Sequence, residues 1–228
     1  GTKLFVPDAN VAGCMIVVAR TSRRGDQGIT LFLVDPKAPG VSITQLKTIA
    51  SDKLCEVTFK NVKVGQDAVL GQVGQGWSAV EKGLQRAAVA KCAEMVGGAQ
   101  QVLEMTVNYA KERVQFGRPI GSFQAIQHHC ANMAIDVDGS RFISYQAAWM
   151  LSEGLPCTKE VAMAKAWTSD AYRRVTALGH QVHGGIGFTK DHDMQLYYRR
   201  AKAAEVTFGD ADFHRDVVAR EIGLPEPA

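Results

Sequence analysis

Short runs of β-branched and other apolar residues dominate the first third of the chain, which predicts β-strands there. Four such runs occur, at residues 15–19, 29–34, 41–44 and 55–59. The last run alternates, with Cys55, Val57 and Phe59 on one face and polar residues on the other. Residues 22–28 are polar and glycine-containing, which predicts a hairpin connection between the first two runs. Because no helical pattern intervenes, these runs predict an antiparallel sheet or part of a barrel.

From Trp77 onward the apolar positions recur every three or four residues, as in amphipathic helices. The apolar stripe of the first predicted helix consists of Trp77, Val80, Leu84, Val96, Ala99, Leu103, Thr106 and Ala110. We expect this helix to continue to about Gln115, which makes it roughly 55 Å long at 1.5 Å per residue.

Breaks in the periodic pattern predict the remaining helices. Gly117 to Pro119 ends the first helix, and a second helix is expected from the N-cap Ser122 to about Ser152. A third helix is expected from the N-cap Thr158 to the glycines at 184–187. Its inward stripe consists of Val161, Ala164, Thr168, Ala171, Val175, Leu178 and Val182. Shorter helices are predicted near 191–203 and 210–221.

The change of period along the chain predicts an α+β protein with two domains. We expect residues 1–72 to form a partial antiparallel β-domain, and residues 73–228 to form an antiparallel four-helix bundle. The small sheet leaves strand edges open, so it is expected to pair with a part of the protein that lies outside this sequence.

Composition narrows the classes of function. Hydrophobic residues make up 46% of the 228 residues and the net charge is +3, which excludes a disordered chain and gives no basis for nucleic-acid binding. No uncharged apolar run approaches the roughly 20 residues of a membrane span. The five cysteines are scattered and no close Cys/His cluster occurs, so neither a disulfide framework nor a metal site is predicted. A soluble protein with reduced thiols is expected.

Three segments carry candidate chemistry. In Arg113–Ile120, an arginine beside a glycine turn suits phosphate oxygens, although a solvated helix end is the more ordinary explanation of this motif alone. In Gln181–Phe188, three glycines in four positions permit close backbone approach to a ligand, or simply end a helix. In Thr207–Asp212, a glycine precedes a last helix, and Asp210 or Asp212 suits the N-cap or first turn of that helix.

Taken together, these motifs resemble the acyl-CoA dehydrogenase family. The resemblance rests on Arg113-x-x-Phe116-Gly117-x-x-Ile120 with Phe123-Gln124, on Gln181-x-x-Gly184-Gly185-x-Gly187-Phe188, and on Arg199-x-x-Lys202. It covers almost the whole chain. It implies FAD as cofactor, an acyl-CoA substrate, an electron-transfer acceptor, and a homo-oligomer, a tetramer or dimer, in which neighbouring subunits complete each flavin site. It also implies a cytoplasmic enzyme, or one of the mitochondrial matrix in a eukaryote.

The resemblance assigns roles to individual residues. The residues implied in FAD binding are Arg113, Gln115, Phe116, Phe123, Gln124, Gln181, Val182, His183, Gly184, Gly185, Asp210 and Asp212. Arg86 and Gly209 are implied in substrate binding. For Arg86, a buried ion pair is the competing interpretation.

The family's catalytic carboxylate is missing from this sequence. The glutamate that removes the acyl α-proton usually stands where this chain has Phe208, or in a minority of members where it has Gln85. Asp210 is the nearest carboxylate and a weak candidate for a relocated base, with helix capping or a flavin contact as its alternatives. Phe5 and Pro7 also replace residues that commonly lie beside the flavin.

Three interpretations therefore stay open. The first is an acyl-CoA dehydrogenase-type flavoenzyme, truncated here, with an altered base for α,β-dehydrogenation of an acyl thioester. The second is a subunit without a base in a hetero-oligomer. The third is a flavin-dependent oxidase or monooxygenase on the same fold. A helical interaction module without substrate is the remaining alternative.

Overall fold

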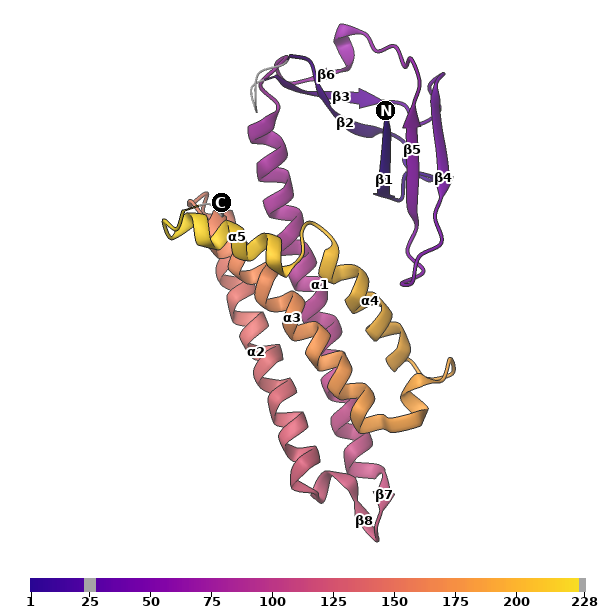
Figure 1. Ribbon diagram of the computed structural model, residues 1–228, viewed down its shortest axis with the longest axis vertical. Helices are drawn as coiled ribbons and strands as arrows, with labels where there is room; N and C mark the ends of the chain where they lie inside the picture. Colours follow the sequence, from indigo (N-terminus) through magenta and orange to yellow (C-terminus); the bar gives the residue numbers. More distant parts are fainter. Residues whose placement is uncertain (23–27, 226–228) are drawn as a thin grey trace. The chain divides into compact units, whose positions relative to one another are not determined.

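The computed structural model describes residues 1–22 and 28–225 (Figure 1). The chain divides into two compact units, Gly1–Gly83 and Leu84–Ala228. The first unit holds two three-stranded sheets, and the second holds most of the helical chain together with a two-stranded hairpin. The expected domain boundary between residues 72 and 73 stays a prediction.

Two three-stranded antiparallel sheets make up the first unit. The strands are β1 (Thr2–Pro7), β2 (Met15–Arg20), β3 (Ile29–Val34), β4 (Val41–Gln45), β5 (Leu54–Phe59) and β6 (Val69–Leu70), with a short 3-10 helix, η1 (Gln66–Ala68), before β6. One sheet has the order β1-β5-β4 and the other β2-β3-β6. The antiparallel strands and the pairing of β2 with β3 confirm the predicted partial antiparallel β-domain. Of the predicted hairpin connection, residues 23–27 lie outside the described residues.

Alternation along β5 builds the small core of this unit. Cys55 and Val57 are fully buried and pack with Ala9, whereas Glu56 between them faces outward. The sequence pattern did not predict β1 or β6. Strand β1 lacks clear alternation because its pairing with β5 shifts between Lys3 and Val6, where Phe5 has a positive φ of 59°.

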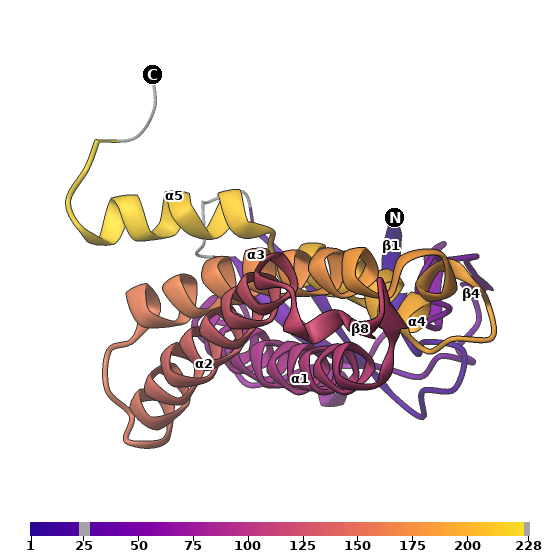
Figure 2. The same ribbon diagram turned by 90° about the horizontal axis from the view of Figure 1, so that it is seen from below.

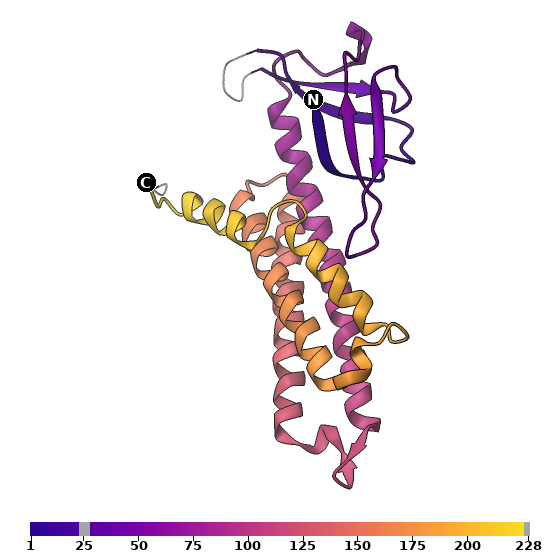
Figure 3. The same ribbon diagram turned by 45° about the vertical axis from the view of Figure 1, so that its right-hand side comes forward.

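Five helices follow: α1 (Trp77–Glu112), α2 (Gln124–Ser152), α3 (Thr158–His183), α4 (Met194–Val206) and α5 (Ala211–Glu221). A small hairpin, β7 (Val114–Gln115) with β8 (Arg118–Pro119), and the 3-10 helix η2 (Ile120–Ser122) connect α1 to α2; η3 (Gly184–Phe188) follows α3. The long helices lie side by side and alternate in direction, with α4 beside α3 (Figures 1, 2 and 3). The predicted helical bundle is therefore confirmed.

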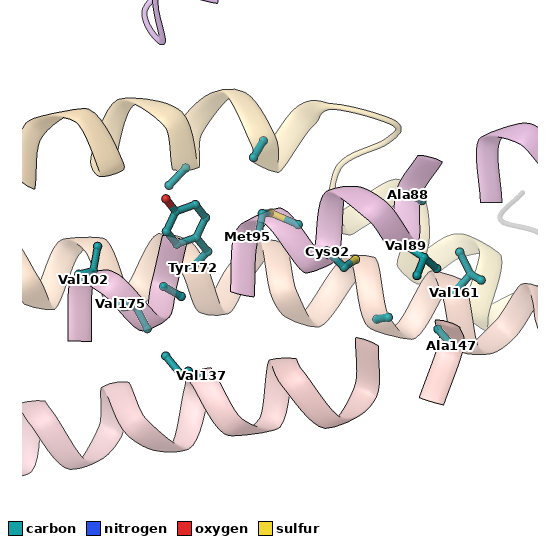
Figure 4. Close-up of a cluster of buried hydrophobic side chains, with 14 of the residues drawn as sticks. Ala88, Val89, Cys92, Met95, Val102, Val137, Ala147, Val161, Tyr172 and Val175 are labelled. Carbon is teal, nitrogen blue, oxygen red and sulfur yellow. The ribbon is translucent and has the colours of Figure 1, made fainter. Parts of the chain in front are cut away.

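Side chains from α1, α2, α3 and α4 meet in one apolar core (Figure 4). Met95 and Val102 of α1, Val137 of α2 and Val175 of α3 all belong to this core, and all four are fully buried. Gly98 has a packing reason, because a Cβ atom there would lie 2.3 Å from the hydroxyl of Tyr172. The three-and-four spacing of apolar residues thus reflects real burial along most of each helix.

The helix ends differ from the expected positions. Helix α1 ends at Glu112 rather than near Gln115, because Val114 and Gln115 pair with Arg118 and Pro119 instead. Ser122 is not the N-cap of α2; its hydroxyl donates to the Pro119 carbonyl, and Phe123 occupies the N-cap position.

Three further expectations about the helices were wrong in detail. Thr158 is the first residue of α3, and Cys157 occupies its N-cap position. The first turns of α1 do not face the core: Trp77 and Leu84 are exposed, and burial begins at Ala88. Helix α4 starts about one turn later than expected, after the 3-10 helix η3.

Candidate functional site

The segment between α1 and α2, Arg113–Ile120, is called the arginine turn here and forms a tight β-hairpin. Phe116 and Gly117 both have positive φ values, 55° and 78°, as the two central residues of a type I′ turn require. Phe116 is 89% exposed, and its ring meets that of Phe123 edge-on at 6.0 Å. Arg118 lies over the Phe123 ring, with its guanidinium carbon 4.2 Å from the ring centroid. The turn therefore presents an aromatic tip on a rigid base.

Arg113 has unused donors at the start of this turn. Its backbone N–H donates to the Tyr109 carbonyl at 2.8 Å, and its own carbonyl accepts from Ile120 at 2.8 Å. Within the described part of the chain its exposed guanidinium forms no ion pair. Gln115 is also exposed. These side chains are available to an anionic ligand.

The segment Gln181–Phe188, called the glycine segment here, covers the end of α3 and the 3-10 helix η3. Some of its glycines are required by the backbone or by packing, and one is not. Gly184 ends the helix with a φ of 65°, a value that favours glycine. Gly187 packs against His180 and His183, so a Cβ atom there would lie 3.1 Å from the His180 ring nitrogen Nδ1. A Cβ atom at Gly185 would meet nothing within 4 Å. The backbone of Gly185 is therefore accessible, with no packing reason for the missing side chain.

A ring stack joins the arginine turn to the glycine segment. The Tyr109 ring of α1 and the His183 ring of α3 are stacked with centroids 4.6 Å apart. His183 Nδ1 lies 2.8 Å from the Gly179 carbonyl, and its ring also meets His192 at 4.9 Å. Val182 and His183 are buried, whereas Gln181 is exposed. Both segments lie at the same end of the helical unit (Figure 1).

The loop between α4 and α5 has an unusual backbone. Phe208 and Gly209 have consecutive positive φ values of 59° and 95°. A Cβ atom at Gly209 would lie 2.5 Å from the Phe213 ring, so glycine is required there by conformation and by space. Asp210 is the N-cap of α5: its Oδ1 accepts from the Phe213 N–H at 2.8 Å. Asp212 in the first turn pairs with Arg215 at 2.7 Å. The capping interpretation of Asp210 is thereby confirmed.

Two buried side chains hold this loop. Lys165 of α3 is fully buried, and its Nζ donates to the Ser169 hydroxyl at 2.9 Å and to the carbonyls of Glu205 at 3.1 Å and Gly209 at 2.8 Å. His214 Nε2 lies 2.9 Å from the Phe208 carbonyl. Burial lowers the pKa of Lys165 and that of His214.

Neither Lys165 nor His214 was expected from the sequence to take part in the site, although a signal for Lys165 was present. Lys165 lies four residues after Val161 and three before Thr168, on the inward stripe of α3, where a charged residue is out of place. No pattern along the chain distinguishes His214, because its partner, the Phe208 carbonyl, is set by the shape of the loop.

Neither expected base position carries a proton acceptor of the required strength. Gln85 Nε2 donates to the Thr158 hydroxyl at 3.1 Å, which ties α1 to the start of α3. Phe208 is 38% exposed. Glu205 faces Lys202 at 3.5 Å and Arg173 at 3.8 Å.

Arg86 is exposed and has no ion pair among the described residues, so the buried-ion-pair interpretation was wrong.

The expected site residues therefore form two groups at opposite ends of the helical unit. The arginine turn and glycine segment follow the C-terminal ends of α1 and α3, whereas the 207–210 loop lies against Lys165, near the start of α3. Along α3 the distance from Lys165 to His183 is about 27 Å at 1.5 Å per residue. One chain thus presents the two groups far apart.

Two family models match this combination of folds and loops. The acyl-CoA dehydrogenase middle domain matches residues 1–62, and the acyl-CoA dehydrogenase C-terminal domain matches residues 74–223. The chain therefore belongs to the acyl-CoA dehydrogenase family.

Curated relatives and solved structures agree with this assignment. The chain is 35% identical to a short/branched chain specific acyl-CoA dehydrogenase of Bos taurus over 96% of this chain and 52% of that protein. It is 34% identical to an acryloyl-CoA reductase (NADH) of Anaerotignum propionicum, over 97% of this chain and 57% of that protein. Butyryl-CoA dehydrogenase from Megasphaera elsdenii matches with a TM-score of 0.93 at 30% identity, over 97% of this chain and 59% of that one. The chain thus spans between half and six-tenths of the length of these relatives.

Two further features of the described residues concern membrane spans and the state of the cysteines. No helix in the described ranges has both the length and the apolar character needed to cross a membrane. All five cysteines are free; Cys55, Cys92 and Cys157 are buried, and Cys14 is exposed.

Proposed function

We propose that this chain is part of an FAD-dependent oxidoreductase that acts on the CH–CH bond of an acyl-CoA thioester. The observation that carries the proposal is the family match over nearly the whole chain, together with relatives named as acyl-CoA dehydrogenases and reductases. Bound FAD would be the acceptor of the hydride that leaves the acyl β-carbon. The soluble compartment, cytoplasmic or mitochondrial matrix, is part of the same proposal.

The arginine turn and the glycine segment suit the diphosphate of FAD. A diphosphate needs cationic and N–H donors that are not already used, and Arg113 offers a guanidinium without an ion pair in the described chain. Gly185 offers an accessible backbone without packing constraint, and Gln115 and Gln181 are exposed nearby in the sequence. The exposed Phe116 ring offers an apolar face for the cofactor. Phe123 and Gln124 would contribute through the base of the turn.

The separation of the two groups supports an oligomer in which two copies complete each flavin site. If both ends of the helical unit contact one FAD, the ends come from different chains. Helix α2 supplies a surface for such an assembly: Ile135, Phe142, Tyr145 and Trp149 are each more than half exposed. Their spacing places them on one outward stripe of α2. Contiguous exposed apolar surface of this kind marks an interface in many proteins.

In our proposal this chain lacks the proton acceptor that a standard acyl-CoA dehydrogenase uses. Phe208 and Gln85 cannot accept a proton, and the Asp210 carboxylate is engaged as a helix cap. This favours, as a second candidate, a subunit that binds or completes FAD for an active partner. Arg86, exposed near the start of the helical unit, and Gly209 remain candidate contacts of the thioester.

The test is a flavin spectrum of the full-length protein, alone and co-expressed with neighbouring gene products, before and after anaerobic addition of acyl-CoAs. Bleaching of the protein alone supports a dehydrogenase, and bleaching only with a partner supports the hetero-oligomer. Flavin that stays oxidised with acyl-CoA, but that a separate reductant bleaches and oxygen then reoxidises with formation of an oxygenated product, supports a monooxygenase. An electron-transferring flavoprotein, as in one structural neighbour, is the proposed acceptor to add. Absence of flavin under all conditions contradicts the proposal.

A gain-of-function variant sharpens the choice between the two candidates. Phe208→Glu supplies a carboxylate at the usual base position, while Phe208→Gln is its uncharged control of the same shape. If the pocket is otherwise that of a dehydrogenase, only the glutamate variant bleaches without a partner. Equal inactivity of both variants, with flavin bound, favours the subunit that needs a partner.

A further inference from the structure

We propose that Lys165 and His214 are positioning residues that hold the backbone carbonyls of Gly209 and Phe208 and thereby fix the direction of the side chain at position 208. The inference rests on the proposed function, because position 208 matters for the chemistry only if the 207–210 loop borders the acyl-CoA site. The two residues contact the loop on its buried side: Lys165 is fully buried and His214 is 6% exposed, so neither faces a ligand directly.

The loop conformation calls for external support. Phe208 carries a bulky side chain at a φ of 59°, in the left-handed region that such residues rarely adopt. Backbone conformations of this kind persist only where the surroundings determine them, and they gather at functional sites. The next residue, Gly209, continues the left-handed path with a φ of 95°. A loop of two such residues would relax to other conformations if its carbonyls were free.

Lys165 closes the loop from both sides. Its Nζ donates to the carbonyl of Glu205, before the loop, at 3.1 Å and to that of Gly209, within it, at 2.8 Å. The third bond goes to Ser169 one turn along α3 at 2.9 Å. A buried ammonium group is unfavourable unless its donors are all used, and an apolar side chain of similar size would fill the space without that penalty. The retained charge therefore has a directional purpose, which is to bind these two carbonyls.

His214 holds the remaining carbonyl of the turn. Its Nε2 lies 2.9 Å from the Phe208 carbonyl, while Nδ1 is buried without a hydrogen-bond partner in the described chain. The proton therefore belongs on Nε2, which donates. The groups facing it include Lys165 and Asp210, and burial together with Lys165 lowers the pKa of His214, so the neutral tautomer persists through neutral pH.

The two donors act on neighbouring peptide groups from different elements. Lys165 comes from α3 and His214 from α5, and they bind the carbonyls of consecutive residues. Rotation of the Phe208–Gly209 peptide would break one or both bonds. Asp210, which caps α5 directly after the loop, fixes the third point. The side chain at position 208 is thereby aimed by contacts that it does not itself make.

The experiment compares full-length protein carrying Lys165→Met, His214→Leu or His214→Gln with the wild type. Methionine keeps the length of lysine without donors, and glutamine restores an amide donor near the place of Nε2. Lys91→Met is the matched control, because it removes a positive charge close enough to lower the pKa of Lys165, while the described ion pair of Lys91 is with Glu94 and not with the loop. Hydrogen exchange of the peptide that contains residues 207–213 reports the loop. The absorbance change of bound flavin on adding butyryl-CoA reports the site.

We expect at least tenfold faster exchange in the loop for Lys165→Met and His214→Leu, near-normal exchange for His214→Gln and Lys91→Met, and unchanged flavin content throughout. The butyryl-CoA signal should weaken at least threefold in the first two variants only. Wild-type loop exchange in both would overturn the inference, as would equal loss in His214→Gln and His214→Leu. If Lys165→Met does not fold, the His214 pair decides. If the wild type binds no flavin, the proposed function fails, and the exchange comparison still tests whether Lys165 and His214 hold the loop.

Discussion

The imidazole ring of His183 stacks on the phenol ring of Tyr109, with the ring planes 22° apart. This contact joins the C-terminal end of α3 to that of α1. Because the Arg113 N–H donates to the Tyr109 carbonyl, the stack also links the glycine segment to the arginine turn. Two segments that are some seventy residues apart in the sequence thus become neighbouring parts of one end of the helical unit.

Arg113→Ala should weaken FAD binding by about 1.5–3 kcal/mol, since a charge-assisted hydrogen bond to the diphosphate is lost. The measurement is a titration of the flavin-free protein with FAD, followed by absorbance or quenching of the flavin emission. Lys111→Ala is the control, because it removes a positive charge from the last turn of α1 without removing the guanidinium of the turn. Equal affinity of Arg113→Ala and wild type would remove Arg113 from the site.

Asp210→Ala should lower the free energy of unfolding by about 1 kcal/mol, because the first turn of α5 loses its side-chain acceptor. Asp210→Asn should remain near wild type in stability, since asparagine caps helices as well as aspartate does. Denaturant unfolding measures both. The asparagine variant also tests catalysis: turnover lost at normal stability and flavin content would identify Asp210 as the base and contradict a purely capping role.

The Asp136–Arg174 pair should couple α2 to α3. Arg174 Nη2 and Nε donate to the two oxygens of Asp136 at 2.7 and 3.0 Å, a bidentate arrangement that raises the pKa of Arg174. Because Arg174 is partly exposed, a double-mutant cycle should give a coupling of only about 0.5–1 kcal/mol, smaller at high salt. The Asp138–Arg141 pair within α2, in which Asp138 is exposed, is the control and should couple more weakly. A coupling of zero for Asp136–Arg174 would contradict the expectation.

Stability should fall as the pH decreases below about 6.5, the ordinary pKa of histidine. Burial lowers the pKa of His180, His183 and His214, so the unfolded chain binds protons in a range where the folded chain does not. The loss begins near pH 6.5 and continues until the pH reaches the lowered values of the folded state. Urea midpoints between pH 8 and pH 5 measure this effect, and His183→Phe should make the slope shallower. An unchanged slope in that variant would contradict the assigned direction for His183.

Sequence periodicity predicted the long helices because their stability comes from one apolar stripe, which repeated spacing reveals. Ala164 and Val175 were placed inward on that ground, and both are fully buried. The same method failed at Trp77 and Leu84, where apolar residues lie outside the core of the described chain. Strand β1 also escaped it, because the irregular pairing around Phe5 disturbs the alternation that a strand normally shows.

The candidate site was predictable only in part, for a physical reason. Motif spacing located the arginine turn, the glycine segment and the capping role of Asp210. It could not reveal that Tyr109 stacks on His183, or that Lys165 and His214 bind the carbonyls of one loop. These contacts join residues distant in sequence, and those of Lys165 and His214 end on backbone carbonyls, which carry no residue-specific signal. The roles assigned to the remaining site residues stay predictions.

The central claim is that this chain helps to bind a flavin, and the ratio of FAD to protein chain in the purified full-length protein tests it most directly. The proposed function predicts flavin absorbance bands, and about one FAD per chain after reconstitution, with that content reduced in Arg113→Ala and unchanged in Lys111→Ala. A protein that remains colourless and binds no FAD in a direct titration, with its fold intact, would contradict the claim.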